Sequence, residues 1–126
     1  SLTDSFTATS FDGTKTQVVT VTINGTNDVP TIGGTTTGTV QEDVSVTGGN
    51  LTTGGTLTIT DVDAGQSSFI AQASAAGTYG IFTLGTNGAW TYTASNAQTA
   101  IQQLGAGQSL TDSFTATSFD GTKTQV

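Results

Sequence analysis

The sequence predicts an all-β protein whose antiparallel strands form a sandwich. Three observations predict this class: Thr alternates with apolar residues along much of the chain, turn residues follow these runs every eight to twelve positions or so, and helical periodicity is nearly absent. We expect seven strands, at residues 16–23, 39–46, 56–60, 67–73, 79–84, 89–93 and 111–119.

The first turn joins two alternating runs at Phe11-Asp12-Gly13-Thr14, because Asp-Gly favours tight hairpins. The same turn returns at Asp120-Gly121, since residues 1–18 recur letter for letter as residues 109–126. The offset is 109 − 1 = 108 residues, which is the size of an independently folding domain rather than of a solenoid unit. The repetition therefore indicates a tandem array of near-identical domains.

A second hairpin is predicted at Asn87-Gly88, which separates the runs 79–84 and 89–93. Strand alternation then places Phe82, Leu84, Trp90 and Tyr92 on one buried face. We interpret the single Trp as a core residue rather than as a stacking platform for sugars.

One short helix is predicted at residues 95–104, as a crossover between strands. Ser95 or Asn96 would cap its start, and Gly105 would end it.

Composition excludes several function classes. The chain has no Cys, Met or His, so no disulfide framework, thiol nucleophile, imidazole base or zinc site of the common kinds is available. Its only basic residues are Lys15 and Lys123, within a net charge of −7, which argues against nucleic acid or anionic membrane as a partner. No apolar run is long enough for membrane insertion, and no signal peptide is visible, as expected for an internal piece of a larger protein.

The acidic residues are few, so their positions carry information. Asp61 and Asp63 form an Asp-x-Asp after the run 56–60, and extended backbone points both carboxylates to the same side. A linker rich in oxygen donors lies at residues 24–30, directly after the run 16–23, and Asp120 lies at a hairpin tip, as does its copy Asp12. Taken singly, each acid is better explained as a solvated turn residue than as a metal ligand. Together they predict a calcium site, because Ca²⁺ takes carboxylate, amide and carbonyl oxygens.

The sequence resembles a VCBS-type repeat of large bacterial surface adhesins of the RTX-like, type I secreted kind, related to cadherin-like and immunoglobulin-like sandwiches. Four segments carry the resemblance: VTVTINGTNDVPTI at 19–32, LTITDVDAG at 57–65, YGIFTLGTNGAWTYT at 79–93 and LTDSFTATSFDGTKTQVVTVTI read across the repeat boundary. The resemblance implies a seven-stranded antiparallel Greek-key sandwich.

The resemblance also implies which residues gather around calcium at one end of the domain: Asn27, Asp28, Asp61, Asp63 and Asp120. Glu42 resembles the acid that serves the opposite junction. Asn24 stands where cadherins usually place an Asp, so the resemblance implies fewer ions or weaker binding.

We expect residues 1–27 to be the C-terminal hairpin, last strand and linker of a preceding repeat, and residues 28–126 to be one repeat that lacks its own last strand. A sandwich without an edge strand is a template for pairing, so we expect strand exchange or head-to-tail association between chains.

The function expected from these features is a structural extender of an adhesin on the bacterial cell surface, serving cell adhesion or biofilm formation, with neighbouring identical repeats and calcium ions as partners. The alternative is a carbohydrate- or surface-binding module of the same adhesin, in which identical copies would supply avidity. An enzyme is the least favoured class, because Asp61 and Asp63 are too close in sequence to flank a glycosidic bond.

Overall fold

The computed structural model describes residues 1–126 and is almost entirely β-structure. Its elements, in chain order, are β1 Leu2–Thr9, β2 Thr16–Ile23, β3 Thr31–Gly34, β4 Asn50–Thr60, β5 Gln72–Ala76, β6 Gly80–Leu84, β7 Ala89–Ser95, α1 Thr99–Gln102, β8 Ala116–Thr117 and β9 Thr124–Gln125. Every strand pairing is antiparallel. The predicted all-β, antiparallel class is confirmed.

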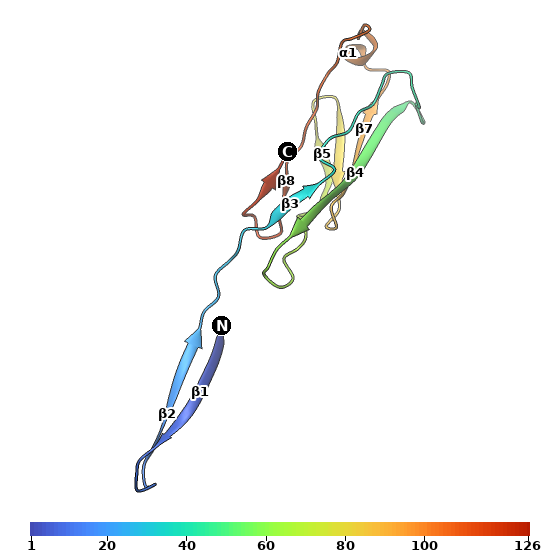
Figure 1. Ribbon diagram of the computed structural model, residues 1–126. Helices are drawn as coiled ribbons and strands as arrows, with labels where there is room; N and C mark the ends of the chain where they lie inside the picture. Colours follow the sequence, from blue (N-terminus) through green and yellow to red (C-terminus); the bar gives the residue numbers. More distant parts are fainter.

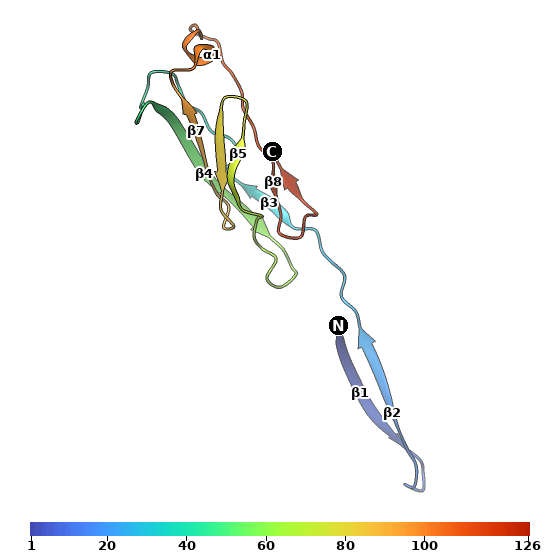
Figure 2. The same cartoon turned by 180° about the vertical axis from the view of Figure 1, so that it is seen from behind.

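The β1–β2 hairpin stands away from the rest of the molecule, at the end of the extended linker 24–30 (Figures 1 and 2). The two strands pair over their full length, from Leu2 opposite Ile23 to Thr9 opposite Thr16. Every residue of both strands is exposed, because the hairpin packs against nothing else in the chain.

The main sheet has the strand order β3-β4-β7-β6-β5. Strand β4 pairs with β7 rather than with its successor, so the β5–β6 hairpin lies beyond β7, a Greek-key type of connection. Strand β4 has 11 residues, more than twice the length predicted at 56–60, and Gly54 and Gly55 lie inside it. A Cβ on Gly54 would lie 2.6 Å from the Trp90 carbonyl oxygen, and one on Gly55 would lie 2.7 Å from the Thr35 side chain. These glycines permit close approach instead of ending the strand.

The β6–β7 hairpin forms at the predicted Asn87-Gly88. Its loop consists of residues 86–88, between the hydrogen-bonded Gly85 and Ala89. The Gly85 N–H donates to the Ala89 carbonyl at 2.8 Å, and the Gly88 N–H donates to the Gly85 carbonyl at 3.0 Å. Gly88 has a φ of 90°, so the loop is a turn followed by a glycine bulge.

The hydrophobic core lies on one face of the main sheet. Its members are Leu51, Leu57, Phe69, Phe82, Leu84, Trp90, Tyr92, Ala94, Ile101 and Ala116. The predicted buried face of the β6–β7 hairpin is thereby confirmed, and Trp90, 6% exposed, is a core residue. Its indole N–H donates to the Thr35 carbonyl at 2.9 Å. The second layer consists of α1, the β8–β9 pair and extended segments of chain (Figure 1).

The strand predicted at residues 39–46 is wrong. Residues 36–40 make no backbone–backbone hydrogen bond, and residues 42–45 form turns in which Asp43 and Ser45 have positive φ. Alternation alone does not make a strand, because a strand requires a partner for its backbone groups.

The last predicted strand, 111–119, is reduced to Ala116–Thr117, since the segment before it also lacks a paired neighbour. The strand predicted at 67–73 is displaced: Phe69 forms an isolated bridge with Ser118, and β5 begins at Gln72.

The helix prediction is correct in place and wrong in extent. Helix α1 covers only Thr99–Gln102, and neither Ser95 nor Asn96 caps it. Asn96 instead binds Asp43, with its side-chain oxygen accepting from the Asp43 N–H and its amide donating to the Asp43 carboxylate.

Candidate functional site

The two Asp-Gly hairpin tips have the same internal structure. In the second, the Asp120 Oδ1 accepts from the Ser118 hydroxyl at 2.7 Å, the Thr122 N–H at 3.0 Å and the Thr122 hydroxyl at 2.7 Å. These bonds, led by the one from the Thr122 N–H, hold the pKa of Asp120 well below its ordinary value. In the first hairpin the Asp12 Oδ1 accepts the equivalent bonds, from the Ser10 hydroxyl and from the hydroxyl and N–H of Thr14, and these lower the pKa of Asp12 to about 2.

The two tips differ in one respect: the second is joined to the linker. The Asn27 side-chain amide donates to the Asp120 Oδ2 at 3.0 Å. The backbone N–H of Asp28 donates to the Asp63 Oδ2 at 2.8 Å. Pro30, two residues after Asp28, is buried. The linker is therefore held at both the hairpin tip and the loop that follows β4.

The loop after β4 contains the Asp-x-Asp pair. The Asp63 N–H donates to the Asp61 Oδ1 at 2.9 Å, and the Ser67 hydroxyl closes the loop by accepting from the Asp61 N–H at 3.0 Å. Two acceptors in this loop remain without a donor although they are buried, the Asp61 Oδ2 and the Gln66 Oε1. Buried oxygens without partners are costly, and a cation is one way to satisfy them.

These contacts connect all five predicted site residues at the linker end of the domain, in the pairs Asn27–Asp120, Asp28–Asp63 and Asp61–Asp63. The structure holds no group of three or more His, Cys, Asp or Glu side chains arranged as a metal cage. The donors present are nonetheless all oxygens, and two of them lack partners, so this donor set fits a hard cation such as calcium. No sequence signal pointed to Gln66, because only the folded loop buries its side-chain oxygen.

Glu42 lies at the other end of the domain, next to Asp43. The side-chain amides of Asn96 and Gln102 donate to the Asp43 carboxylate, and these bonds tie the turn at residues 42–45 to α1. The Glu42 Oε2 is also buried without a hydrogen-bond partner. The hydrogen bond from the Asn96 amide, and to a lesser degree that from the Gln102 amide, lowers the pKa of Asp43.

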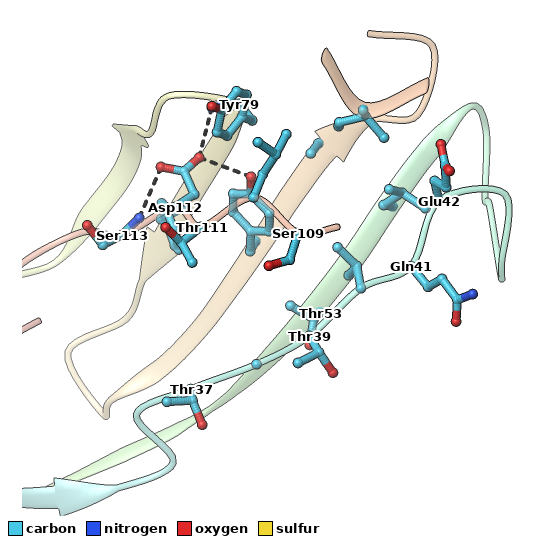
Figure 3. A pocket seen from close by; sticks show the side chains of 18 of the residues that line it. Thr37, Thr39, Gln41, Glu42, Thr53, Tyr79, Ser109, Thr111, Asp112 and Ser113 are labelled. Carbon is cyan, nitrogen blue, oxygen red and sulfur yellow. Dashed lines mark hydrogen bonds between the residues drawn. The ribbon is translucent and has the colours of Figure 1, made fainter. Parts of the chain in front are cut away.

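Asp112 is a structurally important acid that the sequence did not single out. Its carboxylate accepts from the N–H groups of Thr78, Tyr79 and Gly80 at 2.8, 2.9 and 3.2 Å, and from the Tyr92 hydroxyl at 3.0 Å. Figure 3 shows Asp112 beside Tyr79. Partial burial alone would raise the pKa of Asp112, but these bonds outweigh it and lower the pKa. Burial and the bond to Asp112 raise the pKa of Tyr92 to about 12. Asp112 thus fastens the segment before β8 to the start of β6.

A groove of about 970 Å³ opens between residues 36–42 and residues 104–114 (Figure 3). Its floor is the core face of the main sheet, including Leu51, Phe82 and Trp90. Two acids line the groove: the Glu42 Oε2 is buried without a hydrogen-bond partner, and the Asp112 carboxylate is held by the Tyr92 hydroxyl and backbone N–H groups.

The bacterial cadherin-like domain family matches residues 27–126. The chain belongs to this family. The match begins at Asn27, in the linker, and includes the main sheet, α1 and the β8–β9 pair. The cadherin-like sandwich expected from the resemblance is therefore confirmed, whereas the finer assignment to VCBS or RTX adhesins is not tested by this match. No curated protein matches the chain.

None of the helices in this cadherin-like domain has the length and apolar character needed to cross a membrane.

Proposed function

We propose that this cadherin-like domain is an extender repeat of a bacterial cell-surface adhesin, and that calcium stiffens the junction between consecutive repeats. One observation carries the proposal: the linker 24–30 is bound to the domain that follows it through both Asn27 and the Asp28 backbone. An extender transmits force and orientation, so its function depends on such a junction.

Calcium supplies positive charge that the junction lacks. The linker, the Asp61–Ser67 loop and the tip of the second hairpin bring acids together without a Lys or Arg among their hydrogen-bond partners. Asp61 and Gln66 would supply their unpartnered oxygens, and Asp28, Asp63 and Asp120 their carboxylates. With this donor set, the expected dissociation constant is that of extracellular modules, roughly 0.1–1 mM.

The same acids at each junction of an array with net negative charge would repel one another without a counterion. Binding at ten times the dissociation constant would stabilise the folded domain by about 1.4 kcal/mol. Folding outside the cell, where calcium is abundant, would follow from this linkage. The domain would have no catalytic role.

The chain contains a matched control for the site. Asp12 and Asp120 occupy equivalent positions in two hairpins of identical sequence, and each accepts three equivalent hydrogen bonds within its own hairpin. Only Asp120 contacts the linker. Calorimetric titration with Ca²⁺ should therefore show binding that Asp120→Asn weakens about tenfold or more and that Asp12→Asn leaves unchanged. Absence of calcium binding by the unaltered chain, or equal effects of the two substitutions, would remove calcium from the proposal.

A further inference from the structure

The linker begins with an Asn-Gly step, a kind of sequence in which the backbone can react with a side chain. An Asn or Asp precedes a Gly at four places in the chain: Asp12-Gly13, Asn24-Gly25, Asn87-Gly88 and Asp120-Gly121. At such a step the glycine nitrogen can attack the side-chain carbonyl carbon of the residue before it, because glycine has no Cβ to hinder the approach. The reaction needs a glycine nitrogen that no other contact holds in place.

The hydrogen bonds of the glycine N–H groups separate these four steps. Three of the glycines donate to carbonyls within their own turns: Gly13 to Ser10 and Gly121 to Ser118 at 2.9 Å, and Gly88 to Gly85 at 3.0 Å. The Gly25 N–H donates to no group of the chain. The side-chain hydrogen bonds of the linker are made by Asn27, not by Asn24. Asn24-Gly25 is therefore the one step of this kind that the fold leaves free.

The surroundings of Asn24 give the same result. The β1–β2 pairing ends at Ile23 opposite Leu2, and the first linker residue held by the sandwich is Asn27. Asn24 and Gly25 are exposed, and a Cβ placed on Gly25 would meet nothing within 4 Å. Nothing in the chain opposes the rotation that brings the Asn24 Cγ to the Gly25 nitrogen.

Asn87 provides a comparison within the same chain. It is also exposed, so accessibility alone does not distinguish the two steps. However, the Asn87 Oδ1 accepts from the Ala89 N–H at 3.1 Å, and the buried Gly88 has a φ of 90°. The Gly88 carbonyl also accepts from the Leu57 N–H at 2.8 Å. Ring closure at Asn87 would break these bonds and the turn that joins β6 to β7.

We propose that Asn24 is a site of spontaneous deamidation, in which the Gly25 backbone nitrogen is the nucleophile. A bond forms between the Gly25 nitrogen and the Asn24 Cγ, the bond from Cγ to the side-chain nitrogen breaks, and that nitrogen leaves as ammonia with the proton of the Gly25 N–H. The product is a cyclic succinimide. Water, the only co-reactant, then opens the ring. Attack at Cγ gives an aspartyl residue, and attack at the backbone carbonyl carbon gives an isoaspartyl residue.

Both products replace a neutral amide by a carboxylate, which changes the net charge from −7 to −7 − 1 = −8. The new charge lies three residues before Asn27, within about 10 Å along an extended chain. The consequence for the junction rests on the function proposed above. A carboxylate at that distance should raise the affinity for Ca²⁺ about two- to fourfold at low ionic strength. The junction would then become stiffer as the protein ages.

Peptide mapping by mass spectrometry, after incubation of the folded chain at physiological temperature and pH, tests the modification. Asn24 should convert about tenfold faster than Asn87 or more, because two hydrogen bonds must break at the second step. In concentrated urea the two rates should converge, since both residues precede a glycine. Gly25→Ala, for which the structure has room, should slow the conversion of Asn24 to about the rate at Asn87. Equal rates in the folded chain, a difference that persists in urea, or no effect of Gly25→Ala overturns the proposal.

Calorimetric titration with Ca²⁺ tests the consequence for the junction separately. Asn24→Asp reproduces the aspartyl product and should bind calcium more tightly than the unaltered chain, whereas Asn24→Gln, the neutral control, should bind it equally well. Unchanged affinity of Asn24→Asp would show that the added charge does not act on the site. Absence of calcium binding by every variant would refute the proposed function, whereas the conversion of Asn24 measured by mass spectrometry would still stand.

Discussion

The Asp112 carboxylate is predicted to be a principal polar anchor of the sandwich, and its copy Asp4 provides a control in the same chain. Asp112→Ala removes the acceptor for three backbone N–H groups and for the hydroxyl of Tyr92, a residue that is 9% exposed. A hydrogen bond to a charged group contributes about 1.5–3 kcal/mol. Because the site is only partly buried, water would replace some of these partners, and we expect a net loss of about 2–4 kcal/mol in the free energy of unfolding.

Urea unfolding monitored by Trp90 fluorescence measures this loss, at protein concentrations low enough to keep the chain monomeric. Asp4→Ala should change the free energy of unfolding by less than about 0.5 kcal/mol, because Asp4 is exposed and binds only its neighbour. Equal stability of Asp112→Ala and Asp4→Ala would refute the inference that Asp112 anchors the segment before β8.

Three further predictions follow from the core and from the charges. Thermal stability should decline as pH falls below about 4, because the folded-state pKa of Asp112 is lowered: its contribution is complete above the unfolded-state pKa and is lost as pH falls through the folded value. The melting temperatures of the unaltered chain and Asp112→Asn should therefore converge in acid, and a constant difference would contradict this. Phe82→Ala should cost about 3–5 kcal/mol in urea unfolding, since Phe82 is 6% exposed and packs on Tyr92; a cost below 1 kcal/mol would show that the groove already loosens this region. Gly55→Val should lower the melting temperature, because a Cβ there would lie 2.7 Å from the Thr35 side chain, and an unchanged melting temperature would mean that Thr35 moves aside freely.

Local signals in the sequence predicted the strands that pair with near neighbours. Strand β2 has the predicted limits, and the β6–β7 hairpin forms at Asn87-Gly88, because alternation and turn chemistry act over a few residues. The strand predicted at 39–46 failed because its backbone partner is not beside it, which no local pattern reveals. The start of β4 was missed because Gly54 and Gly55 look like breakers in sequence, whereas in the sheet they make room for β7 and Thr35.

The candidate cation site was predictable in part. Sparse acids at Asp61, Asp63 and Asp120 drew attention to the right end of the domain, and the structure connects them to the linker. Asp112 was not distinguishable from other acids, because its partners are mainly backbone N–H groups at the start of β6, far away in sequence. Its identity with Asp4 likewise gave no sign that the two copies occupy different surroundings.

Backbone ¹⁵N relaxation tests the central claim, that calcium stiffens the junction between repeats, most directly. The β1–β2 hairpin and the sandwich are joined only by residues 24–30, so each reports its own tumbling. Repeating the measurement at low protein concentration keeps any self-association from contributing. With millimolar calcium the account predicts one common correlation time for hairpin and sandwich, and with chelator a distinctly shorter one for the hairpin. Correlation times that do not respond to calcium would contradict it.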